Sequence, residues 1–163
     1  MKALFSIFFF SFIVLINNTE AQLKPNLYTY QAAQVQFWYP SEWDVKEEEK
    51  VATLQSFEGA LSITFSIMQA NQIEDALIEL ESIVQTQLTN PTITTDPEIV
   101  DLHGMAGVMT ELEGTMEGNF VQLGVFIIDS PQNVLLVLGM GRKKALKKYN
   151  KELTKIINSI EPI

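Results

Sequence analysis

Few side chains in this sequence could perform nucleophilic or acid–base chemistry. Cysteine is absent and His103 is the single histidine, which excludes a disulfide scaffold, a thiol nucleophile and a thiolate zinc site, as well as a histidine-rich metal centre within one chain. No Gly-x-Ser-x-Gly motif is present to hold a serine nucleophile in a strained turn. His103 is followed by Gly104, and we expect it to be a turn residue that precedes a strand.

Glu111 and Glu113 form the carboxylate pair whose spacing best fits catalysis. Side chains two residues apart share one face of a strand, about 7 Å from each other, a separation compatible with acid–base hydrolysis or with a hard cation. A hydrolase that uses Glu111, Glu113 or Asp129 is therefore one hypothesis. A solvated outer face of the strand explains the same pair, and we predict no catalytic residue, no metal site and no cofactor.

A cluster of basic residues close to the C-terminus is the candidate docking surface. Its members are Arg142, Lys143, Lys144, Lys147, Lys148 and Lys151. Most of them fall in the first two turns of a predicted helix, where each cation opposes the helix dipole at a cost of up to several tenths of a kcal/mol. Helix stability therefore does not explain them, which leaves two accounts: attraction to an acidic body, or a docking surface for phospholipid head groups, lipopolysaccharide phosphates or an acidic partner protein.

The charge distribution favours the first account and argues against one class of partner. Residues 22–141 hold 3 basic and 17 acidic side chains, whereas residues 142–163 hold 7 basic and 2 acidic ones. The whole chain has a net charge of −9, and such an acidic protein is not expected to bind nucleic acid. Just before the cluster, Gly139 and Gly141 lack the spacing of a phosphate-binding loop, and we interpret them as a tight strand-to-helix turn.

Length and composition indicate one folded domain that follows an N-terminal targeting signal. The chain has 163 residues, 47% of them apolar and 19% charged, which fits a single globular unit. Lys2, an apolar run at residues 3–16, and the small residues Thr19 and Ala21 follow the order of a secretory signal peptide. We predict a signal peptide at residues 1–21, cleavage after Ala21, and a mature domain at residues 22–163 that is exported to the periplasm or secreted. The alternative is an uncleaved membrane anchor.

The periodicity of apolar residues predicts the elements that position these side chains. Alternation predicts strands near residues 34–39, 43–45, 51–57, 61–67, 105–113, 120–129 and 134–140. A helical spacing predicts one helix at about residues 73–88 and a second, basic helix at about residues 143–160. Consecutive hairpins imply an antiparallel sheet, so the fold class is α+β, with six to seven strands flanked by two main helices.

The aromatic strand that ends Val35-Gln36-Phe37-Trp38-Tyr39-Pro40, followed by Trp43, resembles the opening motif of the PsbP-like superfamily. That superfamily includes the extrinsic P subunit of photosystem II, the Mog-type Ran-release factor and exported bacterial proteins of DcrB type. The resemblance covers nearly the whole mature chain and implies an antiparallel sheet between helices in a mostly non-enzymatic group of binding and assembly factors. The calcium and manganese sites of its photosynthetic members have no recognisable counterpart in this sequence.

These observations lead to one functional hypothesis and two alternatives. The first is an exported, non-catalytic binding or assembly module that docks an anionic partner through the basic helix. The second is a peripheral envelope protein that contacts anionic lipid head groups, and the third is the carboxylate-dependent hydrolase. We also expect the two amphipathic helices to seal the sheet and to leave only a charged exterior for recognition.

Overall fold

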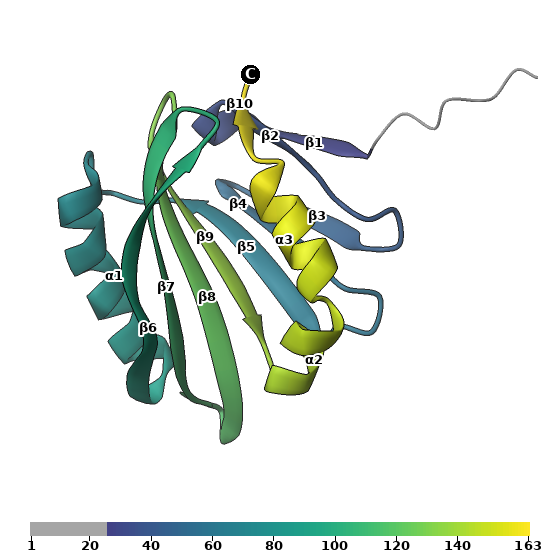
Figure 1. Cartoon of the computed structure of the whole chain (residues 1–163), viewed down its shortest axis with the longest axis vertical. Coiled ribbons are helices and arrows are strands. Elements are labelled where there is room, and N and C mark those ends of the chain that lie inside the picture. The colour runs from purple at the N-terminus through teal and green to yellow at the C-terminus, as the bar shows by residue number, and fades with distance from the viewer. Residues whose placement is uncertain (1–25) are drawn as a thin grey trace, which may run out of the picture.

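The computed structural model describes residues 26–163 (Figure 1). The predicted signal peptide at residues 1–21 and its cleavage site lie outside the described residues. The elements follow in chain order: β1 (Leu27–Tyr30), a 3₁₀ turn (Gln31–Ala33), β2 (Val35–Trp38), β3 (Asp44–Glu48), β4 (Val51–Gln55), β5 (Leu61–Ile67), α1 (Ile73–Gln87), β6 (Thr89–Leu102), β7 (Met105–Met116), β8 (Asn119–Asp129), β9 (Val134–Gly141), α2 (Lys143–Lys148), α3 (Asn150–Asn158) and β10 (Glu161–Pro162).

The main sheet has seven antiparallel strands in the order β3-β4-β5-β9-β8-β7-β6. Five of its neighbouring pairs are hairpins, and the exception is β5 with β9, which are joined through α1 and the β6–β8 meander. A smaller antiparallel sheet of order β1-β2-β10 covers one end. The predicted α+β class and the number of main strands are therefore confirmed.

Alternation along the central strands assigns each side chain to one of two faces. Val121, Leu123, Val125 and Ile127 of β8 are buried in the core that α1 covers, because their side chains share one face of the strand. The residues between them, such as Gln122 and Phe126, face α2 and α3. The two faces therefore have separate cores, and each helical layer covers a different one (Figure 1).

The second core lies beneath α3 and extends to the small sheet. Phe37 of β2 stacks on Phe65 of β5, with ring centroids 4.1 Å apart and an interplanar angle of 6°. Both rings are buried, and Ile156 of α3 belongs to the same cluster. The aromatic strand that carries the family resemblance therefore packs the small sheet against the main one.

The predicted terminal helix is in fact two helices. Tyr149 separates α2 from α3 with φ −100° and ψ 15°, and its ring packs edge-on against Trp43 at a centroid distance of 5.6 Å. The helical hydrogen bonds continue on both sides, from Tyr149 N to the Ala145 carbonyl and from Leu153 N to the Tyr149 carbonyl, each 2.9 Å. The chain therefore bends at the aromatic contact without losing its helical connection.

The strand β6 was absent from the sequence prediction. It is an edge strand with mostly exposed side chains, it contains Pro91 and Pro97, and its pairing with β7 shifts register three times. Proline is tolerated at a sheet edge because a missing donor faces solvent there. Alternation could not reveal this strand because only one of its faces meets protein, and that face is irregular.

Candidate functional site

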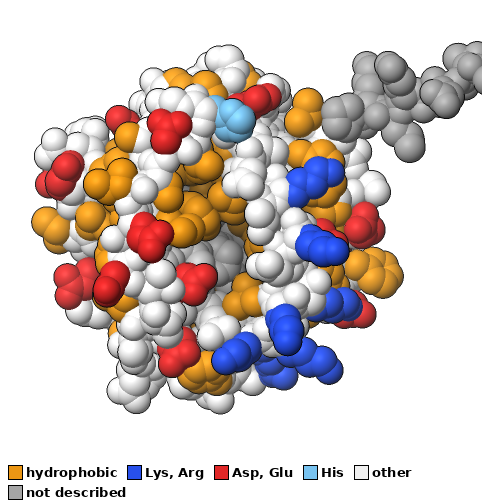
Figure 2. Space-filling model, in the orientation of Figure 1, with side chains coloured by type: hydrophobic (Ala, Val, Ile, Leu, Met, Phe, Trp, Pro, Cys, Tyr) orange, Lys and Arg blue, Asp and Glu red, His pale blue; other side chains and the backbone are white. Residues whose placement is uncertain are grey.

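The candidate functional site is a cavity of 770 Å³ between the concave face of the main sheet and the terminal helices. Strands β5 to β9 form its floor and one wall, and α2 and α3 form the other wall. Figure 2 shows it as a hollow on this side of the molecule, with apolar side chains inside, acidic ones along one side and basic ones along the other. The expectation that both helices seal the sheet is therefore wrong.

Apolar side chains provide most of the lining. Met109 and Phe126 rise from neighbouring strands, since Met109 pairs with Phe126 across β7 and β8. Leu146, Leu153 and Ile157 line the cavity from the helices. A volume of this size lies within the range of about 300–1,000 Å³ that is usual for small-molecule sites.

Two glycines make the floor of the cavity hollow. Gly124 of β8 and Gly139 of β9 are direct partners across the two strands, and both line the cavity. A Cβ built on Gly124 would meet no atom within 4 Å, and one on Gly139 would be 3.9 Å from the nearest atoms, among them Leu153 Cδ2. Glu111 pairs with Gly124 on one side, and Ile63 pairs with Gly139 on the other. The floor of the cavity between the side chains of Glu111 and Ile63 is therefore bare backbone.

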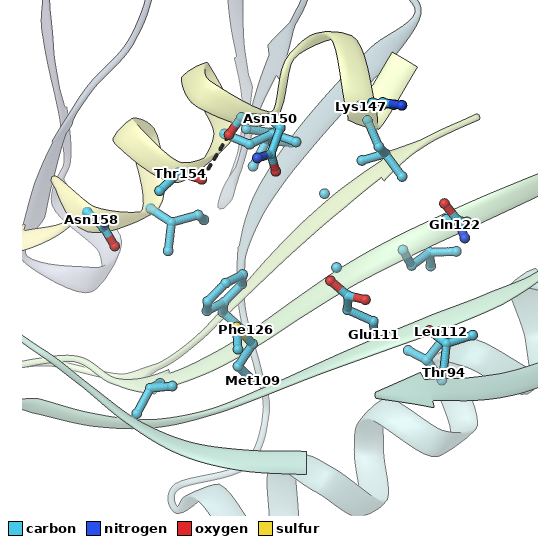
Figure 3. A pocket seen from close by; sticks show the side chains of 18 of the residues that line it. Thr94, Met109, Glu111, Leu112, Gln122, Phe126, Lys147, Asn150, Thr154 and Asn158 are labelled. Carbon is cyan, nitrogen blue, oxygen red and sulfur yellow. Dashed lines mark hydrogen bonds between the residues drawn. The ribbon is translucent and has the colours of Figure 1, made fainter. Parts of the chain in front are cut away.

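Polar and charged side chains enter the cavity from both walls. Glu111 and Gln122 extend from β7 and β8 toward the helices, and Asn150 and Thr154 lie opposite on α3 (Figure 3). The Thr95 hydroxyl donates a hydrogen bond of 3.1 Å to Glu111 Oε2, which fixes the carboxylate on the sheet side. The arrangement offers the anchored Glu111 carboxylate together with uncharged donors and acceptors above an apolar floor. Three more charged residues belong to the lining: Asp101, Lys143 and Lys147.

His103 lies next to the cavity and contacts Asn158, one of its lining residues. It occupies the β6–β7 turn with φ 53°, and its Nε2 lies 2.9 Å from the Asn158 carbonyl oxygen at the end of α3. Asp101, two residues before His103, accepts a hydrogen bond of 3.0 Å from Gly104 N within the turn. The prediction of a turn histidine is confirmed, and the structure adds that it ties the hairpin to the helix.

The predicted basic cluster divides into three groups. Lys143 and Lys147 line the cavity. Arg142 Nη2 donates to Asn119 Oδ1 at 2.9 Å, and Lys148 Nζ lies 2.8 Å from Glu58 Oε2. The hydrogen bond from Lys148 lowers the pKa of the Glu58 carboxyl and raises that of the lysine. All six side chains are exposed, and Lys144 and Lys151 lie outside the cavity lining.

The predicted carboxylates do not gather in one site. Glu111 lines the cavity, and Glu113 is two residues along the same strand but outside the lining. Asp129 lies at the far end of β8, five residues beyond the partner of Glu111, or roughly 17 Å at about 3.4 Å per residue. Within residues 26–163, no group of three or more His, Asp or Glu side chains is placed to hold a metal ion.

The residues that create the cavity are not among the sequence-predicted site residues, although the sequence contains a signal for them. A glycine inside a strand often marks a place where a ligand or another backbone approaches closely. Gly124 interrupts β8, and Gly139 lies inside β9 rather than in the strand-to-helix turn to which it was assigned. Their shared function could not be read from sequence because it depends on the pairing of the two strands.

Comparisons with known proteins identify the fold and no family. No family model matches the chain, and no curated protein matches it. Solved structures that resemble it include cyanobacterial PsbP (CyanoP) from Synechocystis sp. PCC 6803, with a TM-score of 0.61 and 10% identity over 91% of this chain and 99% of that one. LpqN, involved in cell envelope biogenesis of Mycobacterium tuberculosis, has a TM-score of 0.52 and 10% identity, covering 78% of this chain and 83% of LpqN.

A protein from Bacteroides thetaiotaomicron is also similar, with a TM-score of 0.59 and 15% identity over 85% of this chain. The present chain spans 48% of that protein, or about half its length. At such identities the likeness concerns the fold alone. The chain has a PsbP-like fold, in agreement with the resemblance of its aromatic strand.

Proposed function

We propose that this protein is a non-catalytic binding module that holds an amphipathic small molecule in the cavity between the sheet and the terminal helices. The observation that carries the proposal is the paired Gly124 and Gly139, which leave open space in a sheet whose other central positions are filled. Protein interiors otherwise pack to crystal-like density, and an apolar hollow of this size that opens to solvent gains free energy when an apolar ligand displaces its water.

The chemical class of the ligand follows from the lining. Met109, Phe126 and Leu153 offer apolar surface along the floor and the wall, which favours an alkyl chain or a ring system. Glu111 and Gln122 offer a fixed acceptor and an amide on the sheet side, which favours a hydroxyl or amine on one part of the ligand. An elongated amphiphile with a polar group satisfies both requirements.

The non-catalytic part of the proposal rests on the separation of the acidic groups. Two carboxylates line the cavity, Glu111 and Asp101, but Asp101 pairs with Ala106, which is five residues along β7 from Glu111, or roughly 17 Å at about 3.4 Å per residue. Glu113 and Asp129 lie outside the lining. Acid–base hydrolysis by a carboxylate pair, as in glycosidases, uses two carboxyl groups about 5–10 Å apart that flank the scissile bond. A hydrolase of this kind would therefore require a second acidic group closer to Glu111 than Asp101 is.

We further propose that the protein acts in the cell envelope after export. The N-terminal pattern supports export, and the PsbP-like fold is shared with LpqN, a protein involved in cell envelope biogenesis. Among the described residues, none of the helices has both the length and the apolar character needed to cross a membrane. The closer relation to Mog-type and DcrB-type proteins remains part of this proposal, as does docking of an anionic partner by the basic helix.

The proposal is tested with protein secreted by its native host and with N-phenylnaphthylamine, an apolar fluorescent probe. Native mass spectrometry of gently purified protein is expected to reveal a bound amphiphile, and the ligand-stripped protein is expected to enhance the fluorescence of the probe. Gly124→Leu places a side chain in the open space and should abolish both signals.

Gly118→Asn provides the matched control. Gly118 lies in the β7–β8 turn with φ 79°, and a Cβ there meets nothing within 4 Å. Asparagine tolerates that backbone conformation, so this variant also gains a side chain but leaves the cavity unchanged. Probe binding that survives Gly124→Leu, or that is lost equally in both variants, would refute the proposed site.

A further inference from the structure

Two exposed aromatic side chains flank α2 at one end of the molecule. Phe57, in the β4–β5 turn, is 80% exposed, and Phe120, at the start of β8, is 53% exposed. Single exposed apolar residues are common on protein surfaces and require no explanation. These two differ from the others because both are fixed in position next to the same basic helix.

Each phenylalanine has a neighbour that is bonded to one end of α2. Glu58, which follows Phe57, pairs with Lys148 at 2.8 Å. Asn119, which precedes Phe120, accepts a hydrogen bond of 2.9 Å from Arg142. The helix is therefore held between the two turns, with one aromatic ring beside each of its ends.

The two turns themselves are well ordered by hydrogen bonds. Ser56 N donates to the Leu61 carbonyl at 3.0 Å, and Gly59 N donates to the Ser56 carbonyl at 2.7 Å. On the other side, Glu117 and Gly118 both have positive φ, of 49° and 79°, as in the tight two-residue hairpins of antiparallel strands. The exposure of the rings is thus a property of closed turns and not of frayed chain ends.

The charge at this end is opposite to that of the body. Five cations lie within or next to α2, namely Arg142, Lys143, Lys144, Lys147 and Lys148, against two carboxylates in the flanking turns, Glu58 and Glu117. The region up to Gly141 is otherwise strongly acidic. An anionic surface would attract this end and repel the remainder, which orients the molecule with α2 facing that surface.

We propose that this end, made of Phe57, Phe120 and the cations of α2, docks on the surface of an anionic lipid bilayer. Phenylalanine rings beside lysine and arginine combine the apolar insertion and the charge attraction that peripheral membrane binding requires. An acidic protein would pair with the cations, but it would not offer the two separated, protruding rings a continuous apolar layer in which both could be buried.

The docking also orients the cavity. Lys143 and Lys147 belong both to the docking end and to the cavity lining, so the cavity opens next to the proposed membrane contact. If the proposed function is correct, an amphiphile could pass between the bilayer and the cavity with little exposure to water. The membrane contact itself does not depend on any ligand.

The test is vesicle flotation of the mature chain from Gln22 onward, which contains every described element. Vesicles of phosphatidylglycerol and phosphatidylcholine are compared with vesicles of phosphatidylcholine alone, at low and at high salt. We expect binding to the anionic vesicles only, with weaker binding at high salt because exposed charges are screened. Phe57→Ser/Phe120→Ser should lower the partition coefficient at least about tenfold, since burial of a single phenyl ring contributes that much.

Charge is tested separately. Lys144→Glu should lower binding about fivefold or more, whereas Lys50→Glu makes the same change of charge in the β3–β4 turn, at the opposite end of β4, and should have much less effect. Ile78→Ser/Ile99→Ser removes two other exposed apolar side chains, on α1 and on the edge strand β6, and should leave binding unchanged.

Three results would overturn the proposal: no flotation of the wild-type chain, equal binding to neutral vesicles, or equal losses in the control variants. An acidic protein as the true partner would produce the first of these. Binding of N-phenylnaphthylamine by the Phe57→Ser/Phe120→Ser variant separates the two proposals. If this variant binds the probe but not the vesicles, the result supports both the cavity and the membrane contact. If the protein binds vesicles but not the probe, only the cavity proposal is refuted.

Discussion

A substitution that fills the cavity should stabilise the ligand-free protein, whereas most substitutions lower the free energy of unfolding, by about 1 kcal/mol on average. At Gly124 the expected sign is reversed because an added Cβ has no atom within 4 Å and the backbone conformation is one that any residue adopts. The change to examine is Gly124→Leu in protein from which any bound amphiphile has been removed.

The magnitude follows from two contributions. Complete burial of a leucine side chain is worth about 1.5–3 kcal/mol, and a cavity that opens to solvent should yield about 1 kcal/mol of this. Replacing a glycine inside a strand removes a further penalty of roughly 0.5–1 kcal/mol. The expected gain in the free energy of unfolding is therefore about 1.5–2 kcal/mol, or a rise in Tm of about 4–8 °C for a domain of this size.

Urea unfolding of the stripped proteins measures this difference, and Gly141→Leu is the control. Gly141 lies two residues beyond Gly139 in β9, but a Cβ there would be 3.0 Å from Leu61 Cδ1 and 3.1 Å from the Ala60 carbonyl oxygen. The control should therefore lose stability through overpacking, by about 1–3 kcal/mol. If Gly124→Leu destabilised the protein as much as Gly141→Leu, the open space beneath α3 would not exist in solution and the binding proposal would lose its basis.

Three further predictions concern the frame around the site. Phe65→Ala should cost about 3–5 kcal/mol in urea unfolding, because the ring is buried and stacked on Phe37. Burial raises the pKa of Tyr30 to about 12, so the neutral phenol stabilises the fold fully below pH 10 and this stabilisation is lost as the pH rises toward 12. Between these pH values the free energy of unfolding of Tyr30→Phe should fall less than that of the wild type, by on the order of 1–2 kcal/mol in unfolding curves. His103→Ala should remove about 0.5–1.5 kcal/mol by breaking the contact with the Asn158 carbonyl, and hydrogen exchange should be faster in the β6–β7 turn while β8 is unchanged.

The elements with a regular pattern were predictable from the order of the residues. The alternation in β5 and the apolar run in β9 specify strands because one or both of their faces are buried. The apolar spacing of α1 likewise predicts a helix with one covered face. Local patterns of this kind indicate that one face of a segment is buried, but they do not identify the element that covers it.

Elements whose residues depend on distant partners were not predictable. The edge strand β6 is set by its pairing with β7, and its prolines and exposed side chains carry no alternation. The bend at Tyr149 depends on Trp43, which lies more than one hundred positions earlier in the chain. In both cases the deciding contact is tertiary, because the local sequence is compatible with more than one conformation.

The candidate sites divide in the same way. The basic residues of α2 were identifiable because charge is a property of each side chain, independent of the fold. The cavity was not identifiable, because it arises where Gly124 and Gly139 become neighbours through the register of β8 and β9. A missing side chain acquires a function only when strand pairing places a second one beside it and a helix spans the gap, and no stretch of linear sequence contains that arrangement.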